Sequence, residues 1–418
     1  MLASSSVSKA FTRPMSFLAA LALPAVLATP GVAGQPAKAD KPKVAFVLVD
    51  KAKRLEYLAN ATIWSDPGNL TPAALRAGSP LHDGSGVEAA LNGTPFPCTF
   101  AEPGKTLGGA SKKFSCTTKA GKTIRVKFTE ASKAGNREVF ATVAASRLMW
   151  ALGFTSHPVY PIALQCLDCP EDPMSGDGPR ATRTYVATYE PRWTDPALVD
   201  HADRDQGWRW AELDSAIDTA LSGELQARQR KYFDALTLAG VLLQHGDRKP
   251  EQQRLSCLGP LQDGAGSIRQ MDDNPVFVET PGATACPSPA VSVQDLGATF
   301  GGAGSASKGS TAKMNLHEWA EKPVFLKSAP GAACHGDLTV SMAAGEGSLP
   351  NPRIGEAGRL FLLDRLRRLT DAHLTAIFDA ARVNLLPQDG DAEGAGVAAW
   401  VAAFKAKVRQ IEERTCAP

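Results

Sequence analysis

The chain has 418 residues, of which 44% are hydrophobic and 21% charged, and its 45 basic side chains nearly balance its 43 acidic ones. This is the composition of an ordinary globular protein, which excludes disorder, collagen and coiled coil as descriptions of the whole chain. The formal net charge of +2 gives no support to nucleic-acid binding, so we expect no nucleic-acid partner.

The N-terminal segment predicts export. Lys9 and Arg13 precede a short apolar run at 17–28, and small residues follow it. This is the pattern of a secretory signal peptide over residues 1–34, and the run is shorter than the roughly 18 apolar residues that a membrane span needs. We therefore expect a periplasmic or extracellular protein that begins with a polar linker at 35–42 and has no membrane span in its mature form.

The cysteines fit this compartment. All eight follow the predicted signal peptide, and an even number in an exported chain favours disulfide bonds. The spacing of Cys166 and Cys169 also suits a pair of zinc ligands, although no second CxxC and no HxxxH accompanies it. Metal binding and free thiols thus stay open as alternatives. The simplest disulfide pairing joins nearest neighbours: Cys98 with Cys116, Cys166 with Cys169, Cys257 with Cys286, and Cys334 with Cys416.

The first predicted elements are strands. Val44–Val49 has the composition of a strand, and Phe114–Thr117 and Thr123–Thr129 form a hairpin pattern around a turn at 119–122. In the second strand of this hairpin, apolar side chains alternate with charged ones. Lys127 is therefore expected on the face opposite the apolar residues.

Helices come next. One is expected from Arg137 to Leu152, with an apolar stripe, Glu138 at its N-terminal edge and Gly153 ending it. A strand follows at Thr184–Tyr189. The segment Tyr232–Gln244 is apolar nearly all round, which is typical of a buried helix. The chain ends in three predicted helices, at Gly358–Leu369, Asp371–Arg382 and Val397–Glu413.

Two features in the first half of the chain suit nucleotide binding. A turn with Gly108 and Gly109 precedes the strand that carries Lys127, and the helix with Glu138 comes next. In kinase-like folds, backbone amides of a glycine turn approach the phosphates, a strand lysine neutralises phosphate oxygens, and a helix carboxylate positions that lysine. Each feature alone has an ordinary alternative: a turn, a solvated strand face, or a first-turn acid favoured by the helix dipole.

Two features in the second half suit metal binding and proton transfer. The helix at Tyr232–Gln244 runs into a loop with Asp247, and a strand leads to Asp295. In phosphoryl transfer, one loop aspartate orients the hydroxyl nucleophile and a second holds Mg²⁺. Gln252 lies five residues after Asp247, the offset of Asp and Asn in HRDxxxxN, and would offer the metal a neutral oxygen. Alternatively, both aspartates are ordinary turn residues.

These segments carry a resemblance to a known family. Residues of about 95–160, 232–255 and 291–301 are similar to a family of exported bacterial proteins with a kinase-like core. The segment GGASKKF…VKF resembles the glycine turn and lysine strand of HipA-type serine/threonine kinases. The segment HGDRKPEQQ resembles the catalytic loops of lipid kinases and of the secreted Golgi casein kinase family. The resemblance covers about half of the mature chain.

The resemblance implies the fold class and the domain organisation. The class would be α+β, with the two-lobed layout of protein kinases. A strand-rich N-lobe that binds nucleotide would occupy 43–165, and a helical C-lobe with the catalytic loop and metal site would occupy 166–388. A linker and a C-terminal helix would complete the chain at 389–418.

The resemblance also implies the activity and its residues. The protein would be an ATP-dependent phosphotransferase that uses Mg²⁺ or Mn²⁺ and acts on a hydroxyl group of a protein or a small molecule. Lys127 would bind ATP, Asp247 would be the catalytic aspartate, and Gln252 and Asp295 would coordinate the metal.

The chain departs from its relatives at three points. Gln252 replaces the asparagine of many relatives, and Pro250 lies inside the loop. The helix acid of the relatives aligns either with Glu138 or one turn later, at Thr142. These departures leave two alternatives open: an exported pseudokinase that acts as a scaffold without catalysis, and an enzyme that transfers AMP on the same core.

Overall fold

The computed structural model describes most of the chain after the predicted linker. The signal peptide, the linker, Gly108 and Gly109 lie outside the described residues. Residues 43–418 form a single unit, which holds every element named below. The described residues are 44–418 except 92, 104–110, 130–134, 194, 201–206, 259–266, 272–276, 282–285, 302–312, 330–331, 342–344, 346, 387–395 and 418.

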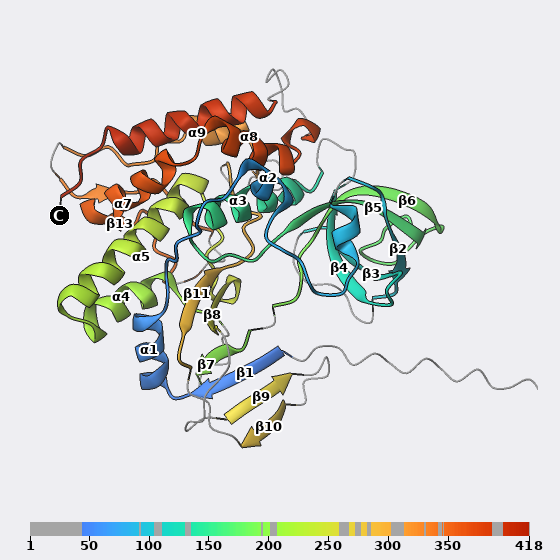
Figure 1. The fold of residues 1–418 in the computed structure, drawn as a ribbon, viewed down its shortest axis with the longest axis horizontal. Helices are drawn as coiled ribbons and strands as arrows, with labels where there is room; N and C mark the ends of the chain where they lie inside the picture. Colours follow the sequence, from blue (N-terminus) through green and yellow to red (C-terminus); the bar gives the residue numbers. More distant parts are fainter. Residues whose placement is uncertain are drawn as a thin grey trace, which may run out of the picture. The chain divides into compact units, whose positions relative to one another are not determined.

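Five strands close into a small barrel (Figure 1). The expected hairpin is present in it as β3 and β4, whose inward-facing apolar residues alternate with outward-facing ones. Phe114, Phe128 and Tyr185 pack against one another within the barrel core. Around the barrel the strands follow the order β2 (Phe96–Ala101), β3 (Lys113–Thr118), β4 (Thr123–Thr129), β6 (Ala181–Tyr189) and β5 (Tyr160–Cys169).

The barrel continues beyond the expected end of the N-lobe at residue 165. That boundary falls inside β5, which pairs with β6 from Tyr160 opposite Tyr189 to Cys169 opposite Ala181. The strand expected at Thr184–Tyr189 is thus part of the same barrel as the hairpin. The hairpin and this strand are joined by pairing between segments that are distant in the sequence, and the local residue pattern does not indicate such pairing.

The two loops with the predicted aspartates adjoin neighbouring strands of a second sheet. The strand expected at Val44–Val49 is present as β1, but it pairs with β7 and β9 of this sheet. Gln253 of β8 lies opposite Val293 of β11, so the segment after Asp247 and the segment before Asp295 run side by side. The strand order is β10 (Phe277–Pro281), β9 (Ser267–Met271), β1 (Val44–Val49), β7 (Ala197–Asp200), β8 (Gln253–Cys257) and β11 (Pro289–Val293).

Helix α3 (Glu138–Leu152) lies between the barrel and the C-terminal helices. It ends at Gly153, whose φ of 86° is left-handed, as the sequence predicts. Its burial differs from the prediction, because nearly all of its side chains are buried and not one stripe alone. Strands β4, β5 and β6 contact it, and so do α7 (Glu356–Arg367) and α8 (Asp371–Ala380), which leaves little of the helix surface for solvent.

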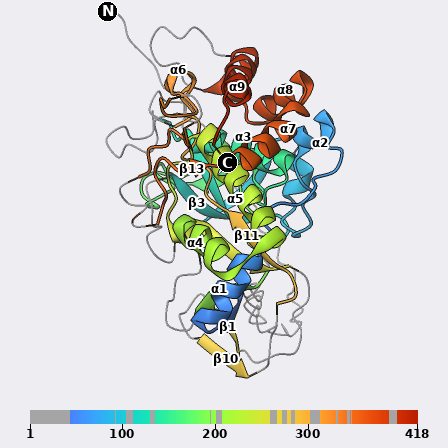
Figure 2. The same cartoon turned by 90° about the vertical axis from the view of Figure 1, so that its left-hand side faces the viewer.

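The remaining helices match the predictions in kind. The buried helix expected at Tyr232–Gln244 forms the second half of the longer α5. The three predicted C-terminal helices are present as α7, α8 and α9, and Figure 2 shows α8 beside α9, which it contacts. The helices other than α3 are α1 (Lys51–Asn60), α2 (Pro72–Ala77), α4 (Trp210–Ala220), α5 (Gly223–Leu243), α6 (Leu316–Glu321), α7 (Glu356–Arg367), α8 (Asp371–Ala380) and α9 (Val397–Glu412). Short 3₁₀ turns lie at Val87–Ala90, Pro250–Gln252 and Val383–Leu385. A two-stranded sheet pairs β12 (Cys334–His335) with β13 (Arg353–Ile354).

All four nearest-neighbour cysteine pairs are disulfide bonds, which confirms the simplest pairing. No cysteine is left free, and no group of three or more His, Cys, Asp or Glu side chains within the described ranges is arranged to hold a metal ion. The zinc alternative at Cys166 and Cys169 therefore does not hold. The mixture of helices and sheets confirms the α+β class. No helix in the described part of the chain has the length and apolar character to cross a membrane.

Candidate functional site

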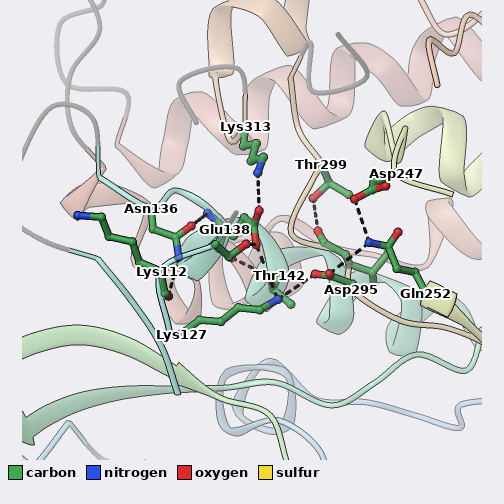
Figure 3. Close-up of polar contacts among 12 residues, drawn as sticks. Lys112, Lys127, Asn136, Glu138, Thr142, Asp247, Gln252, Asp295, Thr299 and Lys313 are labelled. Atoms are coloured by element: carbon green, nitrogen blue, oxygen red, sulfur yellow. Dashed lines mark hydrogen bonds and ion pairs between the residues drawn. The ribbon is translucent and has the colours of Figure 1, made fainter. Parts of the chain in front are cut away.

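Lys127 lies among three carboxylates, and Figure 3 labels two of them, Glu138 and Asp295. Its Nζ atom is 2.8 Å from Asp295 Oδ1, 3.2 Å from Glu190 Oε1 and 3.8 Å from Glu138 Oε2. The lysine side chain is only 11% exposed, and that of Glu138 8%. The contact expected between the strand lysine and a helix acid is thus present, together with two further carboxylates.

Electrostatics fixes the charge states in this cluster. Burial opposes the charge on Lys127, but Glu190, Asp295 and Glu138 outweigh it and raise the pKa of the lysine well above its ordinary value. Lys127 in turn lowers the pKa of Asp295 to about 2, against the opposing effect of burial. At neutral pH the site therefore holds a fixed ammonium group beside a fixed carboxylate.

The barrel positions Glu190. Lys127 on β4 lies opposite Thr188 on β6. Residues opposite each other across two strands project from the same face, and so do residues two apart along one strand. Glu190, two residues after Thr188 and just past the end of β6, continues this alternation, and its carboxylate lies 3.2 Å from Lys127 Nζ. Sequence reasoning missed this acid because the pairing of β4 with β6 has no local signature.

The start of α3 positions Glu138. The Asn136 side chain accepts a hydrogen bond from the backbone N–H of Glu138 at 3.3 Å and donates to the carbonyl oxygen of Phe128, in β4, at 3.2 Å. One side chain thus ties the first turn of the helix to the strand that carries Lys127. Thr142 is 2% exposed and donates its hydroxyl to the Glu138 carbonyl at 2.7 Å. Of the two aligned positions, it is Glu138 whose carboxylate meets the lysine.

Glu138 has two further partners that the sequence did not indicate. Ser111 Oγ and Lys313 Nζ both donate to its carboxylate. Figure 3 shows Lys313 reaching the carboxylate from the side opposite Lys127. Ser111 lies in the glycine-turn segment GGASKKF, in which only the glycines were predicted to act, and no motif surrounds Lys313.

The turn at Asp295 lies close to α3. Asp295 has a left-handed backbone, with φ of 45°. At Gly297, a Cβ atom would lie 2.9 Å from Cγ of Glu138, which is closer than real Cβ atoms approach. Glycine is therefore needed at this point of the turn. Because it has no side chain, the turn can lie close enough to α3 for Asp295 and Glu138 to contact the same lysine.

Gln252 connects the two predicted aspartates. Its Nε2 atom donates to Asp247 Oδ2 at 2.9 Å and to Asp295 Oδ2 at 3.4 Å. The backbone N–H of Gln294 donates to the carbonyl oxygen of Gln252 at 2.8 Å, which holds the two loops in register. Figure 3 shows the three side chains in one row beside Lys127.

The oxygen atoms of this row fit a hard divalent cation. Mg²⁺ prefers carboxylate and amide oxygens. The Oε1 atom of Gln252 is buried and has no hydrogen-bond partner in the described part of the chain. The orientation of an amide is assigned from its hydrogen bonds, and the reversed orientation would direct this oxygen to the two aspartates. The set contains two carboxylates and one amide, so it is not one of the all-acid, histidine or cysteine groups considered above.

A buried histidine and arginine support the loop of Asp247. Neither ring nitrogen of His245 has a hydrogen-bond partner among the residues that the structure describes, and burial, aided by Arg248, lowers the pKa of the histidine to about 3. Arg248 donates from Nε to the His245 carbonyl at 3.1 Å, and its guanidinium lies 3.8 Å from the centre of the Trp210 ring. Neither side chain is exposed, so we assign both a structural role.

The structure therefore brings together five of the seven predicted site residues. Gly108 and Gly109 lie outside the described residues, and their role stays a prediction. The residues that converge are Lys127, Glu138, Asp247, Gln252 and Asp295, and those that sequence reasoning missed are Ser111, Glu190 and Lys313.

Comparisons with known proteins add little. No family model and no curated protein matches the chain. Among solved structures, the Helicobacter pylori proinflammatory kinase CtkA is similar at 13% identity, over 76% of this chain and 96% of that chain, with a TM-score of 0.36. A TM-score at this level does not establish a shared fold, so the two-lobed kinase layout stays a prediction.

Proposed function

We propose that the protein is a kinase-like phosphotransferase that uses ATP and a divalent metal ion to phosphorylate a hydroxyl acceptor. The supporting observation is that Lys127, Asp295, Gln252 and Asp247, which come from three separate segments, lie in one continuous row of contacts. Phosphoryl transfer needs a cation for the phosphate oxygens, oxygen ligands for a metal, and a carboxylate for the hydroxyl proton. The row offers all three.

Each side chain has one task in this proposal. Lys127, kept charged by Glu138 and Glu190, binds phosphate oxygens. Asp295 and Gln252 hold the metal ion, which neutralises charge on the phosphates when bound. Asp247 accepts a hydrogen bond from the acceptor hydroxyl and takes its proton as the new phosphorus–oxygen bond forms and ADP leaves.

Export is part of the proposal. The N-terminal pattern and the four disulfide bonds support it, because disulfides persist in oxidising compartments. Mass spectrometry of the chain secreted from its host tests it: we expect a mass that lacks residues 1–34 and gains eight hydrogen atoms when the four disulfides are reduced. A chain with its N-terminus intact and eight free thiols would contradict export.

A labelling experiment tests the chemistry. The purified, oxidised protein is incubated with Mg²⁺ or Mn²⁺, a hydroxyl-rich acceptor protein such as casein, and ATP labelled at the α or the γ phosphate. We expect γ label on the acceptor or on the protein itself, and no α label. Asp247→Asn should abolish transfer, whereas Asp371→Asn, an exposed aspartate on α8, should not.

Other outcomes of this experiment distinguish the alternatives. Transfer of α label would replace phosphorylation with AMP transfer. Absence of any transfer, with ATP binding that does not depend on metal, would favour the scaffold. Full activity of Asp247→Asn would remove that residue from the mechanism.

A further inference from the structure

A cavity of about 350 Å³ lies beside the second half of α3. Its most deeply buried charged residue is Arg147, nine residues along the helix from Glu138, which is about 14 Å at the rise of an α-helix. The volume is within the range of small-molecule sites. None of the residues in the row from Lys127 to Asp247 lines it. Residues that matter for its chemistry are Ser65, Ser79, Arg147, Trp150, Phe154 and Tyr160.

Arg147 is a buried cation that has no acidic partner among the described residues. It is 3% exposed, and it donates only to backbone oxygens, from Nη1 to Val159 at 2.7 Å and from Nη2 to Ala77 at 3.2 Å. Its Nε atom has no partner, and within the described residues no carboxylate lies at ion-pair distance from it. Burial lowers its pKa to about 10, so the group is still charged at neutral pH. A buried charge of this kind is costly unless an anion accompanies it.

The rest of the cavity wall is polar on one side and apolar on the other. The Tyr160 hydroxyl donates to the carbonyl oxygen of Ser79 at 2.9 Å and lies 3.2 Å from the Ser79 hydroxyl. Trp150 and Phe154 supply aromatic surface. The acidic residue of the wall, Asp66, is exposed, and its carboxylate accepts from the backbone N–H of Gly68 at 3.0 Å.

We propose that this cavity binds a small organic anion, whose carboxylate or phosphate oxygens pair with Arg147 and whose apolar body packs against Trp150 and Phe154. The anion would supply the negative charge that the described residues do not place beside Arg147, and hydroxyl groups near Tyr160 would donate hydrogen bonds to its oxygen atoms. This site is separate from the proposed phosphotransferase site and does not depend on it.

Three probes of similar size test the ligand chemistry. Benzoate and phenyl phosphate carry an oxyanion on an apolar ring, and benzyl alcohol carries none. Titration calorimetry of the full, oxidised chain should show binding of at least one anion, at least tenfold tighter than that of benzyl alcohol. The stronger of the two anions identifies the class as carboxylate or phosphate. Equal binding of all three probes, or no binding of either anion, would overturn the proposal.

Two variants locate the binding. Arg147→Met should weaken the preferred anion at least tenfold. Arg254→Met is the matched control, because Arg254 is also buried and donates to a backbone oxygen, that of Asp195 at 2.7 Å, but is not part of the cavity wall. Ser65→Trp, at an exposed position of the wall, should block entry without disturbing the fold, which circular dichroism verifies. Anion affinity that survives both Arg147→Met and Ser65→Trp would place the ligand elsewhere.

Discussion

A buried cation lies at each half of α3, and the two cations differ in their number of carboxylate partners. At its first turn, Glu138 faces Lys127, which has three carboxylates within 3.8 Å or less. In its second half, Arg147 has two backbone carbonyls and no carboxylate among the described residues. The three carboxylates keep Lys127 charged and in position to bind phosphate oxygens. Arg147 has no carboxylate partner among the described residues, so the proposed anionic ligand would neutralise its charge.

The first way to break this comparison is to remove the better-paired cation. Lys127→Met should lower the rate of phosphoryl transfer about 10²–10³-fold, because a charge aimed at the transferring group is lost. Lys119→Met, in the exposed turn between β3 and β4, is the control and should leave the rate unchanged. Steady-state rates with γ-labelled ATP measure both. Wild-type rates for Lys127→Met would contradict its role.

The same substitution should also affect stability. Lys127→Met leaves Glu138, Glu190 and Asp295 without their shared cation, and we expect it to lower the free energy of unfolding by about 2–3 kcal/mol at pH 7. This figure is below that of a fully buried pair, because the Asp295 side chain is 41% exposed. The loss should shrink as the pH falls and the unpaired carboxylates take up protons. Urea unfolding of both proteins at pH 7 and pH 5 measures it, and a variant as stable as wild type would contradict the account.

The parts of this site that the sequence predicted are those with a local signal. The hairpin with Lys127, the helix with Glu138 and the buried helix before Asp247 each follow from periodicity and turn residues. The aspartates were candidates because each follows a buried element at a loop. The disulfide pairing was predicted equally well, because all four bonds join neighbouring cysteines.

The parts that the sequence did not predict depend on pairing over long distances. Glu190 reaches Lys127 only because β6 closes the barrel beside β4. Likewise β1 has the pattern of any short strand, and its place between β7 and β9 is set by residues more than a hundred positions away. Arg147 falls within an apolar helix, where nothing in the spacing shows that its surroundings contain no acid.

His245 is a third buried basic side chain, and it extends the comparison because it is uncharged in the folded chain at neutral pH. Burial lowers the pKa of His245 to about 3, below its ordinary value of 6.5. Between these pH values the unfolded chain binds a proton that the folded chain does not. This histidine's contribution is therefore fully present above pH 6.5 and decreases as the pH falls toward 3, by up to about 1.4 kcal/mol per pH unit.

Between pH 8 and pH 5, the free energy of unfolding of wild type should fall by about 2 kcal/mol because of His245, and His245→Gln should not show this part of the decrease. His335→Gln, at an exposed ring, is the control and should leave the pH dependence as it is. Urea midpoints at the two pH values measure the difference. A pH dependence that is the same in wild type and His245→Gln would show that folding does not lower the pKa of this histidine.

The smallest expected effect belongs to the unpaired cation. Arg147→Met loses two hydrogen bonds to backbone oxygens but also removes a buried charge that has no acid beside it. These effects oppose each other, so the free energy of unfolding should change by less than about 1 kcal/mol without added anion. Urea unfolding measures it beside Lys127→Met. A loss as large as that of Lys127→Met would mean that the chain already compensates the charge of Arg147.

The central claim is that Asp295, Asp247 and Lys127 form a metal–nucleotide site, and titration calorimetry with ATP, with and without Mg²⁺, tests it most directly. Wild type should bind ATP in a metal-dependent way. Asp295→Ala should lose most of that affinity, about 2–4 kcal/mol, because Asp295 is the proposed carboxylate ligand. Asp247→Ala should stay within about tenfold of wild type, because it acts on the acceptor hydroxyl. Equal, metal-independent binding of ATP by all three proteins would contradict the claim.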